Sequence, residues 1–345
     1  MTSTHQQSGH STGSAQHYVP RAYLKRFTDT FGTLWVLEKG RKPRASRPKD
    51  EAHRKDFYTH RERGVRDETA ERILSALESR VSPVLQKIAN PQFQMSPEQV
   101  GSLYLFVALM FVRVPAWREF LGKYAAARMK SLDMKVARDP EQFHADFVES
   151  QKRFGRDIDL NQSKVESEKL RSLILSGEYE IEQRSVGFNL GMMFYSMFDV
   201  AEELTSFGFQ ILRAPNTPTS NPSLPRLPET TAFVTCDNPV ITIRPQLDGT
   251  AAAGVGFGRP GTEVYMPLNK RCCLRLARGL KPAHAWVSEQ FTRQINTQIM
   301  ANASQFVYSS RGEKRLGRLF DEFGSKMKIG ENAFMPPRAV PPSVG

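Results

Sequence analysis

The chain has 345 residues, of which 39% are hydrophobic, 10% are aromatic and 24% are charged. This composition is typical of a globular protein and excludes the disordered, fibrous and collagen-like classes, while the length is enough for a sizeable core in one or two domains. The 48 Lys and Arg residues outnumber the 36 Asp and Glu residues and give a net charge of +12. This charge attracts polyanions in general and does not identify a particular partner.

The longest apolar run, LYLFVALMFV at 103–112, is too short to cross a hydrocarbon core that needs about 20 residues. No apolar stretch of a secretory signal occurs in the first sixteen residues. The three cysteines form no CxxC pair and make a poor framework for disulfides. We therefore expect a cytoplasmic protein that has no membrane partner and no structural zinc site.

Residues 1–15 are polar and predict a disordered tail, and residues 331–345 predict a loose Pro-rich tail. Between them we expect a single domain over residues 16–330. Alternating β-favouring residues predict a strand over 33–38, and a short strand over 56–59 is expected to pair with it.

Helical patterns follow. Asp67 is an N-cap candidate for a helix with apolar spacing over 70–88, and the run Ser96, Pro97, Gln99 predicts a capping box that opens the most apolar helix. Further helices are expected over 141–153, 164–175 and 190–204, and a last one over 288–303.

The period changes to that of strands near residue 209, and a Pro-rich loop is expected over 216–228. Strands are predicted over 263–267 and 272–276, and the segment FVYSS is expected to return to the sheet. The fold class is therefore α+β, with a helical N-terminal and middle part packed with a small, mostly antiparallel sheet that N-terminal and C-terminal strands form.

The segment FVTCDNPVITI is the sharpest local signal for a functional site. An apolar strand runs into Asp237 and Asn238, and the following proline pushes Asn238 out of the α region into a sharp turn. Such a turn presents a carboxylate at the end of a rigid strand, which suits a catalytic Asp237 with Asn238 as a ligand-binding neighbour. The alternative is that Asp237 only caps its own turn through local hydrogen bonds.

Two further residues are candidates. Arg113 follows a long apolar helix and precedes Val114-Pro115, so a buried guanidinium there needs an anion, which a ligand, Asp237, Asp199 or a glutamate could supply. His17 stands where the polar tail gives way to the ordered chain, and its imidazole suits a general base or a metal ligand near neutral pH. Each has a structural alternative, a salt bridge for Arg113 and an anchored terminus for His17.

The excess positive charge is concentrated between residues 39 and 66, where eleven basic residues face four acidic ones. Arg41, Lys42, Arg44 and Arg47 are the candidates for contacts with phosphates of a nucleic acid or another polyanion. The alternative is a solvated loop, because aromatic residues that stack on bases are few there, only Phe57 and Tyr58.

Several short motifs resemble, in their order and spacing, an uncharacterised family known as domain of unknown function 4238. They are HYVPRAYLKRF at 17–27, DFYTHRE at 56–62, RVP at 113–115, FVTCDNPV at 233–240 and INTQIMANASQFVYSS at 295–310. The resemblance covers nearly all of residues 16–310. Arg21 stands where the family pattern has Gln, and Cys236 where it has Ser. The resemblance implies that these residues recur together in the family, and it implies no particular activity.

Two classes of function are consistent with these features. One is a hydrolase or binder that acts on nucleic acid or a nucleotide, with His17 and Asp237 as acid and base, Arg113 balancing anionic charge, and a divalent metal compatible with the same residues. The other is a scaffold or interaction protein without catalysis, in which Arg113 and Asp237 are a structural brace. No P-loop, dinucleotide fingerprint, GxSxG or HExxH motif occurs.

Overall fold

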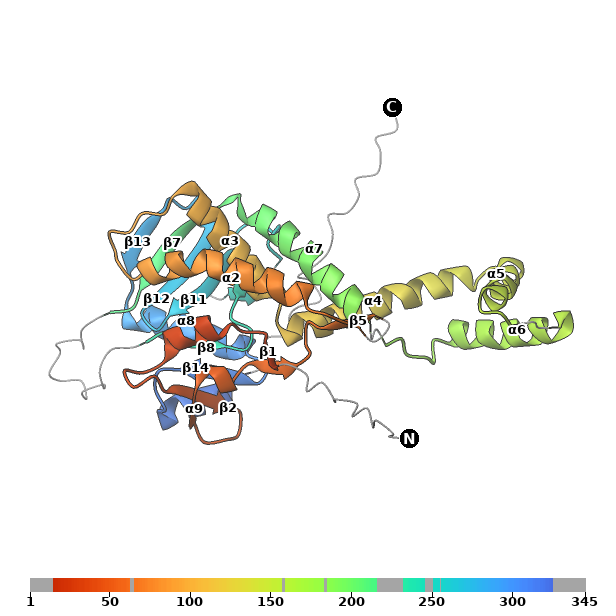
Figure 1. Ribbon diagram of the computed structural model, residues 1–345, viewed down its shortest axis with the longest axis horizontal. Coiled ribbons are helices and arrows are strands. Elements are labelled where there is room, and N and C mark those ends of the chain that lie inside the picture. Colours follow the sequence, from red (N-terminus) through yellow and green to blue (C-terminus); the bar gives the residue numbers. More distant parts are fainter. Residues whose placement is uncertain are drawn as a thin grey trace, which may run out of the picture. The chain divides into compact units, whose positions relative to one another are not determined.

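The computed structural model describes residues 15–62, 65–156, 159–182, 185–215, 232–245, 251–254 and 256–324 (Figure 1). The predicted tails at 1–15 and 331–345, apart from Ala15, and the predicted Pro-rich loop at 216–228 lie outside these residues. The chain separates into two compact units, one made of Met1–Trp117 with Val186–Gly345 and the other of Arg118–Ser185. The prediction of one domain over residues 16–330 stays a prediction.

The larger unit is built on a six-stranded sheet with the order β10-β9-β11-β12-β7-β13. Every neighbouring pair is antiparallel except the parallel pair of β13 and β7. The strands are β7 Phe207–Arg213, β9 Ile241–Pro245, β10 Ala251–Ala253, β11 Glu263–Asn269, β12 Cys272–Arg278 and β13 Ala283–Trp286.

A second, four-stranded sheet joins the two ends of the chain in the order β3-β2-β14-β8, all antiparallel. Its strands are β2 Leu34–Glu38, β3 Arg44–Ser46, β8 Thr235–Cys236 and β14 Phe306–Ser309. Two short ladders complete the β structure described, β1 Ala15–His17 with β4 His53–Lys55 and β5 His60–Glu62 with β6 Val65–Asp67.

Helix α3 is the buried centre of the helical layer. It begins with the predicted capping box, in which Ser96 and Gln99 exchange hydrogen bonds, and nearly all of its side chains from Leu103 to Val112 are buried. It packs between α2 and α7, and α2 and α3 lie across the six-stranded sheet in Figure 1. The helices of this unit are α1 Arg21–Leu24, α2 Thr69–Lys87, α3 Pro97–Val112, α7 Val186–Leu204, α8 Glu289–Asn302 and α9 Lys314–Phe323.

A second part of the core lies under α8. Ile295, Ile299 and Met300 of this helix are buried in one cluster with Leu212 and Cys273 of the six-stranded sheet. The cluster also contains Val307 of β14 and Phe320 of α9. Residues of α8, α9 and both sheets therefore share one hydrophobic core.

The smaller unit is helical in its described residues. Helices α5 Pro140–Arg153 and α6 Leu160–Ser176 pack on each other, and α4 Pro115–Val136 leads into the unit from the end of α3. Asp139 and Asp159 cap the starts of α5 and α6 with their carboxylates. Its small core comprises Ala137, Phe143 and Ile174.

The α+β class and the mostly antiparallel pairing are confirmed, and the predicted helices over 141–153, 164–175, 190–204 and 288–303 coincide with α5, α6, α7 and α8. The strand over 56–59 is wrong, and so is its pairing with 33–38, because β2 pairs with β3 and β14. Residues 56–58 form a turn instead, since Asp56 has a φ of 50° and the N–H of Tyr58 donates to the side chain of Gln16.

In the part of the chain that the structure describes, no single helix is both long and apolar enough to cross a membrane. Helices α3 and α4 together, bent at their break, meet the length and composition of a span, and α3 is buried in the larger unit.

Gly208 of β7 lies close to another part of the backbone. A Cβ at this position would lie 1.8 Å from the carbonyl oxygen of Leu280, in the connection between β12 and β13, and a backbone atom cannot move aside as a side-chain end can. We expect Gly208→Ala to lower the free energy of unfolding by at least about 2 kcal/mol, measured by denaturant unfolding.

Gly101 of α3 is the matched control, because a Cβ there meets no atom within 4 Å. Since alanine favours a helix, Gly101→Ala should leave stability unchanged or raise it by up to about 1 kcal/mol. Equal midpoints for wild type and Gly208→Ala would contradict the packing described for β7.

Candidate functional site

His17 ends β1, and pairing with β4 fixes its position opposite His53. The centroids of the two imidazole rings are 5.4 Å apart. Burial and the neighbouring His53 lower the pKa of His17 below its ordinary 6.5, against a hydrogen bond with the backbone of Lys49 that raises it. The ring is therefore neutral at neutral pH. Its Nε2 is buried without a hydrogen-bond partner among the described residues, so it can accept a proton.

Arg113 lies directly behind His17 and is only 2% exposed. Its Nη1 contacts Oε1 of Glu78 at 2.6 Å, and its Nη2 donates to the carbonyl oxygen of His17 at 2.6 Å. Its Nε donates to the hydroxyl oxygen of Tyr58 at 3.4 Å, and that hydroxyl donates to the carbonyl oxygen of Arg113 at 3.0 Å. The anion that the sequence requires is thus a glutamate of α2.

The charge of Arg113 is held in place by these partners. Burial disfavours the cation, but Tyr58 and Glu78 outweigh this and hold the pKa of Arg113 above its ordinary value. Removal of the partner of a buried cation in such a network lowers the free energy of unfolding by several kcal/mol. Because all three kinds of guanidinium nitrogen are engaged by protein atoms, Arg113 is an organising residue of the site.

A polar cavity of about 330 Å³ opens in front of these two residues. Helix α2 contributes Glu71, Ser75 and Glu78, whose spacing of four and three residues places them on one face of the helix. Arg21 and Lys25, at the start of α1 and just after it, add two exposed cations. The cavity therefore combines a neutral imidazole, two carboxyl groups and a cationic rim.

Glu71 differs from an ordinary surface glutamate. Burial raises its pKa above the ordinary 4.5, and the nearby Arg113 offsets only part of this rise. Its Oε2 is buried and has no hydrogen-bond partner in the part of the chain described. A carboxyl group that holds its proton to higher pH can serve as a general acid.

Asp237 lies elsewhere, in the turn between β8 and β9, and is 4% exposed. Its Oδ1 accepts a hydrogen bond from the N–H of Ser304 at 2.8 Å, and its Oδ2 accepts from Gln305 at 2.7 Å and Phe306 at 3.1 Å. Burial raises the pKa of Asp237 to about 6, although the three backbone donors lower it. The carboxylate thereby ties this turn to the link between α8 and β14.

Asn238 makes the second half of the same link. Its amide donates to the carbonyl oxygen of Asn302 at 3.3 Å, and the amide of Asn302 donates to the carbonyl oxygens of Asn238 at 2.7 Å and Val240 at 3.1 Å. The Asp-Asn-Pro motif is therefore a lock between two segments that are about 64 residues apart in sequence.

The structure thus brings two of the four predicted site residues into the lining of one cavity. His17 and Arg113 line one cavity, whereas Asp237 and Asn238 do not belong to its lining. A brace between Arg113 and Asp237 is not formed, because each takes the partners given above. A catalytic Asp237 and a ligand-binding Asn238 stay predictions.

The basic segment lies on an exposed surface around β3, at the edge of the four-stranded sheet. Arg44 is held by Glu51 through two hydrogen bonds of 2.5 and 2.9 Å, and Arg41 pairs with Glu38 at 3.0 Å. Lys42 and Arg47 are exposed, and no ion pair engages them among the described residues. Of the four candidates, these two therefore keep their charge available for a polyanion.

Within the described ranges, no group of three or more His, Cys, Asp or Glu side chains is arranged to hold a metal ion. The divalent metal suggested by the sequence thus has no assigned set of ligands and stays a prediction.

Glu71, Ser75 and Glu78 escape prediction from sequence. Their only signal is the polar face of a helix whose apolar face points to the core, and most polar helix faces are simply solvated. The charged residues at 21 and 25 are equally ordinary in sequence. They become part of a site only because β1 and α1 pack beside α2 and Arg113.

We expect Asp237→Ala to act on stability. It leaves the three backbone N–H groups of Ser304, Gln305 and Phe306 without their carboxylate acceptor, so the free energy of unfolding should fall by about 3 kcal/mol. Denaturant unfolding measures this loss, and Asp199→Ala, an exposed carboxylate on α7, is the control with an expected change within about 0.5 kcal/mol. An unchanged stability of Asp237→Ala would contradict the lock and favour a catalytic role.

The family described as "Protein of unknown function (DUF4238)" matches residues 15–313, which include every residue of the cavity and of the lock. No curated protein and no solved structure matches the chain. The chain belongs to the DUF4238 family.

Proposed function

We propose that the chain binds and hydrolyses a phosphate ester of a nucleotide or nucleic acid in the cavity in front of Arg113. The observation that supports it most is the Nε2 of a neutral His17, which has no hydrogen-bond partner among the described residues, in a cavity that also holds Glu71 with a raised pKa. A base without its proton and an acid with its proton are the two groups that ester hydrolysis requires.

In this proposal His17 Nε2 takes a proton from a water molecule as the water oxygen attacks phosphorus. Glu71 gives its proton to the oxygen of the leaving alcohol as the bond between phosphorus and that oxygen breaks. Arg21 and Lys25 neutralise the phosphate oxygens, and no oxidant or cofactor is needed. Proton exchange with solvent restores both groups.

Arg113 acts in this proposal as a positioning residue. Its Nη2 holds the carbonyl oxygen of His17 and its Nη1 holds Glu78, so it fixes the strand that carries the base against the helix that carries the acid. Its own guanidinium is engaged, which leaves phosphate contacts to the exposed cations of the rim.

The second candidate function is that of a scaffold or interaction protein without catalysis. One observation favours it, namely that Arg113 and Asp237 both have their polar atoms engaged by protein groups in the interior. Under this alternative the cavity only accommodates the network around Arg113, and no phosphate ester is cleaved.

The pH dependence of hydrolysis tests the assignment of base and acid. Activity requires neutral His17 and protonated Glu71, so the rate should rise as His17 loses its proton, at a pH below 6.5, and fall as Glu71 ionises, at a pH above 4.5. Release of p-nitrophenol from bis(p-nitrophenyl) phosphate and cleavage of RNA and DNA oligonucleotides measure the profile.

Two variants test which residue causes each limb of the pH profile. His17→Gln keeps the backbone carbonyl that Arg113 holds and should lower kcat at least about 100-fold. Glu71→Gln should remove the descending limb. His144→Gln and Glu119→Gln, in the smaller unit, are matched controls that leave the profile unchanged. Wild-type protein without any phosphodiesterase activity, or variants with full activity, would contradict the proposal and favour the scaffold.

The basic surface supplies a second test, which concerns nucleic acid as the partner. We expect wild-type protein to bind single-stranded oligonucleotides with an affinity that falls as salt rises, and the double variant Lys42→Gln/Arg47→Gln should reduce the slope of log K against log salt by about two. Fluorescence anisotropy at several salt concentrations measures it.

The control for this experiment is Arg128→Gln/Lys169→Gln, which removes the same charge from exposed positions of the smaller unit. If both double variants had the same slope of log K against log salt, the attraction would come from the net charge of +12 alone. The basic surface would then make no specific contact with nucleic acid.

A further inference from the structure

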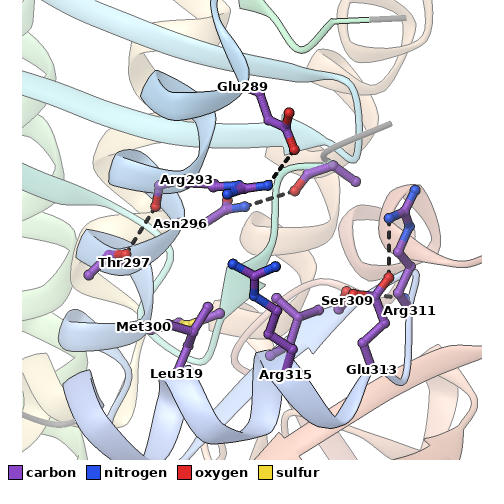
Figure 2. Close-up of a pocket in the computed structure, with 12 residues that line it drawn as sticks. Glu289, Arg293, Asn296, Thr297, Met300, Ser309, Arg311, Glu313, Arg315 and Leu319 are labelled. Atoms are coloured by element: carbon purple, nitrogen blue, oxygen red, sulfur yellow. Dashed lines mark hydrogen bonds and ion pairs between the residues drawn. The ribbon is translucent and has the colours of Figure 1, made fainter. Parts of the chain in front are cut away.

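A second cavity, of about 190 Å³, lies between α8 and α9 and shares no lining residue with the cavity of His17 (Figure 2). One wall is a face of α8 with Arg293, Asn296 and Met300, at a helical spacing of three and four residues. The opposite wall is α9 and the link that leads into it from β14.

The floor of this cavity is apolar. Met300 is 1% exposed and belongs to the core cluster that also contains Ile295 and Phe320. Leu316 and Leu319 of α9 pack against the same cluster and are only partly covered, so they face the cavity with apolar surface. A ligand with an apolar part gains free energy by covering this floor.

The rim of the cavity has an excess of positive charge. Two of its three arginines are paired, Arg293 with Glu289 at 2.6 Å and Arg311 with Glu313 at 3.2 Å. An anion that enters the cavity is attracted by this field.

Arg315 is the cation without a partner. It is exposed, and no hydrogen bond or ion pair engages its guanidinium within the described residues. In Figure 2 this guanidinium points from α9 into the space below Arg293 and Asn296, and no dashed line reaches it. A guanidinium offers a planar fork of donors that matches a carboxylate or a phosphate.

The remaining polar groups of the walls are already engaged. Asn296 accepts from the N–H of Val234 at 3.0 Å and donates to the carbonyl oxygen of Ala232 at 2.8 Å, and the hydroxyl of Thr297 donates to the carbonyl oxygen of Arg293 at 3.0 Å. The cavity therefore offers one strong donor and an apolar floor.

We propose that this cavity binds a small organic anion, in which one carboxylate or phosphate contacts Arg315 and an apolar body covers Met300, Leu316 and Leu319. The volume supports a compact ligand, because cavities for drug-sized molecules are larger, at about 300–1,000 Å³. An inorganic anion would leave the apolar floor uncovered, and a neutral apolar molecule would leave Arg315 without its partner.

The experiment is a titration of the full chain with benzoate, phenyl phosphate, benzyl alcohol and inorganic phosphate. Calorimetry and ligand-observed NMR measure the binding. We expect saturable binding of benzoate or phenyl phosphate at millimolar concentration or below, and binding at least about tenfold weaker for benzyl alcohol and for inorganic phosphate. The comparison of the two aromatic anions decides between a carboxylate and a phosphate.

Two variants locate the site. Arg315→Gln should weaken binding of the aromatic anion at least about tenfold, whereas Arg318→Gln, on α9 but outside the cavity lining, should leave it unchanged. Leu319→Phe fills the floor and should weaken binding while the charge stays, and its unfolding midpoint shows whether the fold is intact.

Three results would overturn the proposal. They are the absence of saturable binding for both aromatic anions, equal binding by wild type and Arg315→Gln, and inorganic phosphate that binds as tightly as phenyl phosphate. The variants of the His17 cavity should not change the affinity for benzoate, which is not a phosphate ester, so failure here leaves the proposed hydrolysis untouched.

Discussion

One buried cation, the guanidinium of Arg113, organises the site described above. It stands at the end of the most apolar helix and joins the carbonyl oxygen of His17, the carboxylate of Glu78 and the hydroxyl of Tyr58. These groups belong to β1, α2 and the turn that precedes β5, which are far apart in sequence. Since a buried cation that loses its partner costs several kcal/mol, the network strongly favours one arrangement of these segments, and this arrangement forms the cavity.

Asp237 also holds distant segments together, but through a carboxylate that accepts hydrogen bonds from backbone N–H groups. Its three hydrogen bonds go to consecutive N–H groups at the start of β14, so they fix the path of the chain from α8 into the four-stranded sheet. Arg113 and Asp237 thus form two anchors in the larger unit. The hydrogen bonds of His17, Arg113 and Asp237 thus give each of these residues a part in holding the fold.

Features that depend on neighbours in sequence were predictable. The capping box at Ser96 and Gln99, the buried helix after it and the α+β class follow from local spacing. Features that depend on distant partners were not. The strand over 56–59 fails because the side chain of Gln16, some forty residues earlier, holds the N–H of Tyr58 in a turn. The sequence required an anion for Arg113 but left open that it is Glu78, since α2 presents many polar residues at helical spacing.

The two cavities show how the surroundings of an arginine decide what it can do. Arg113 uses all three of its guanidinium nitrogens for contacts with protein groups, and one of these contacts holds β1 in place. Arg315 is exposed beside an apolar floor and keeps its donors. The same contrast applies on the basic surface, where Glu51 holds Arg44 while Lys42 and Arg47 remain exposed. Contacts with anionic partners should therefore come from the cations that folding leaves unpaired, and the buried ones keep the shape of the sites.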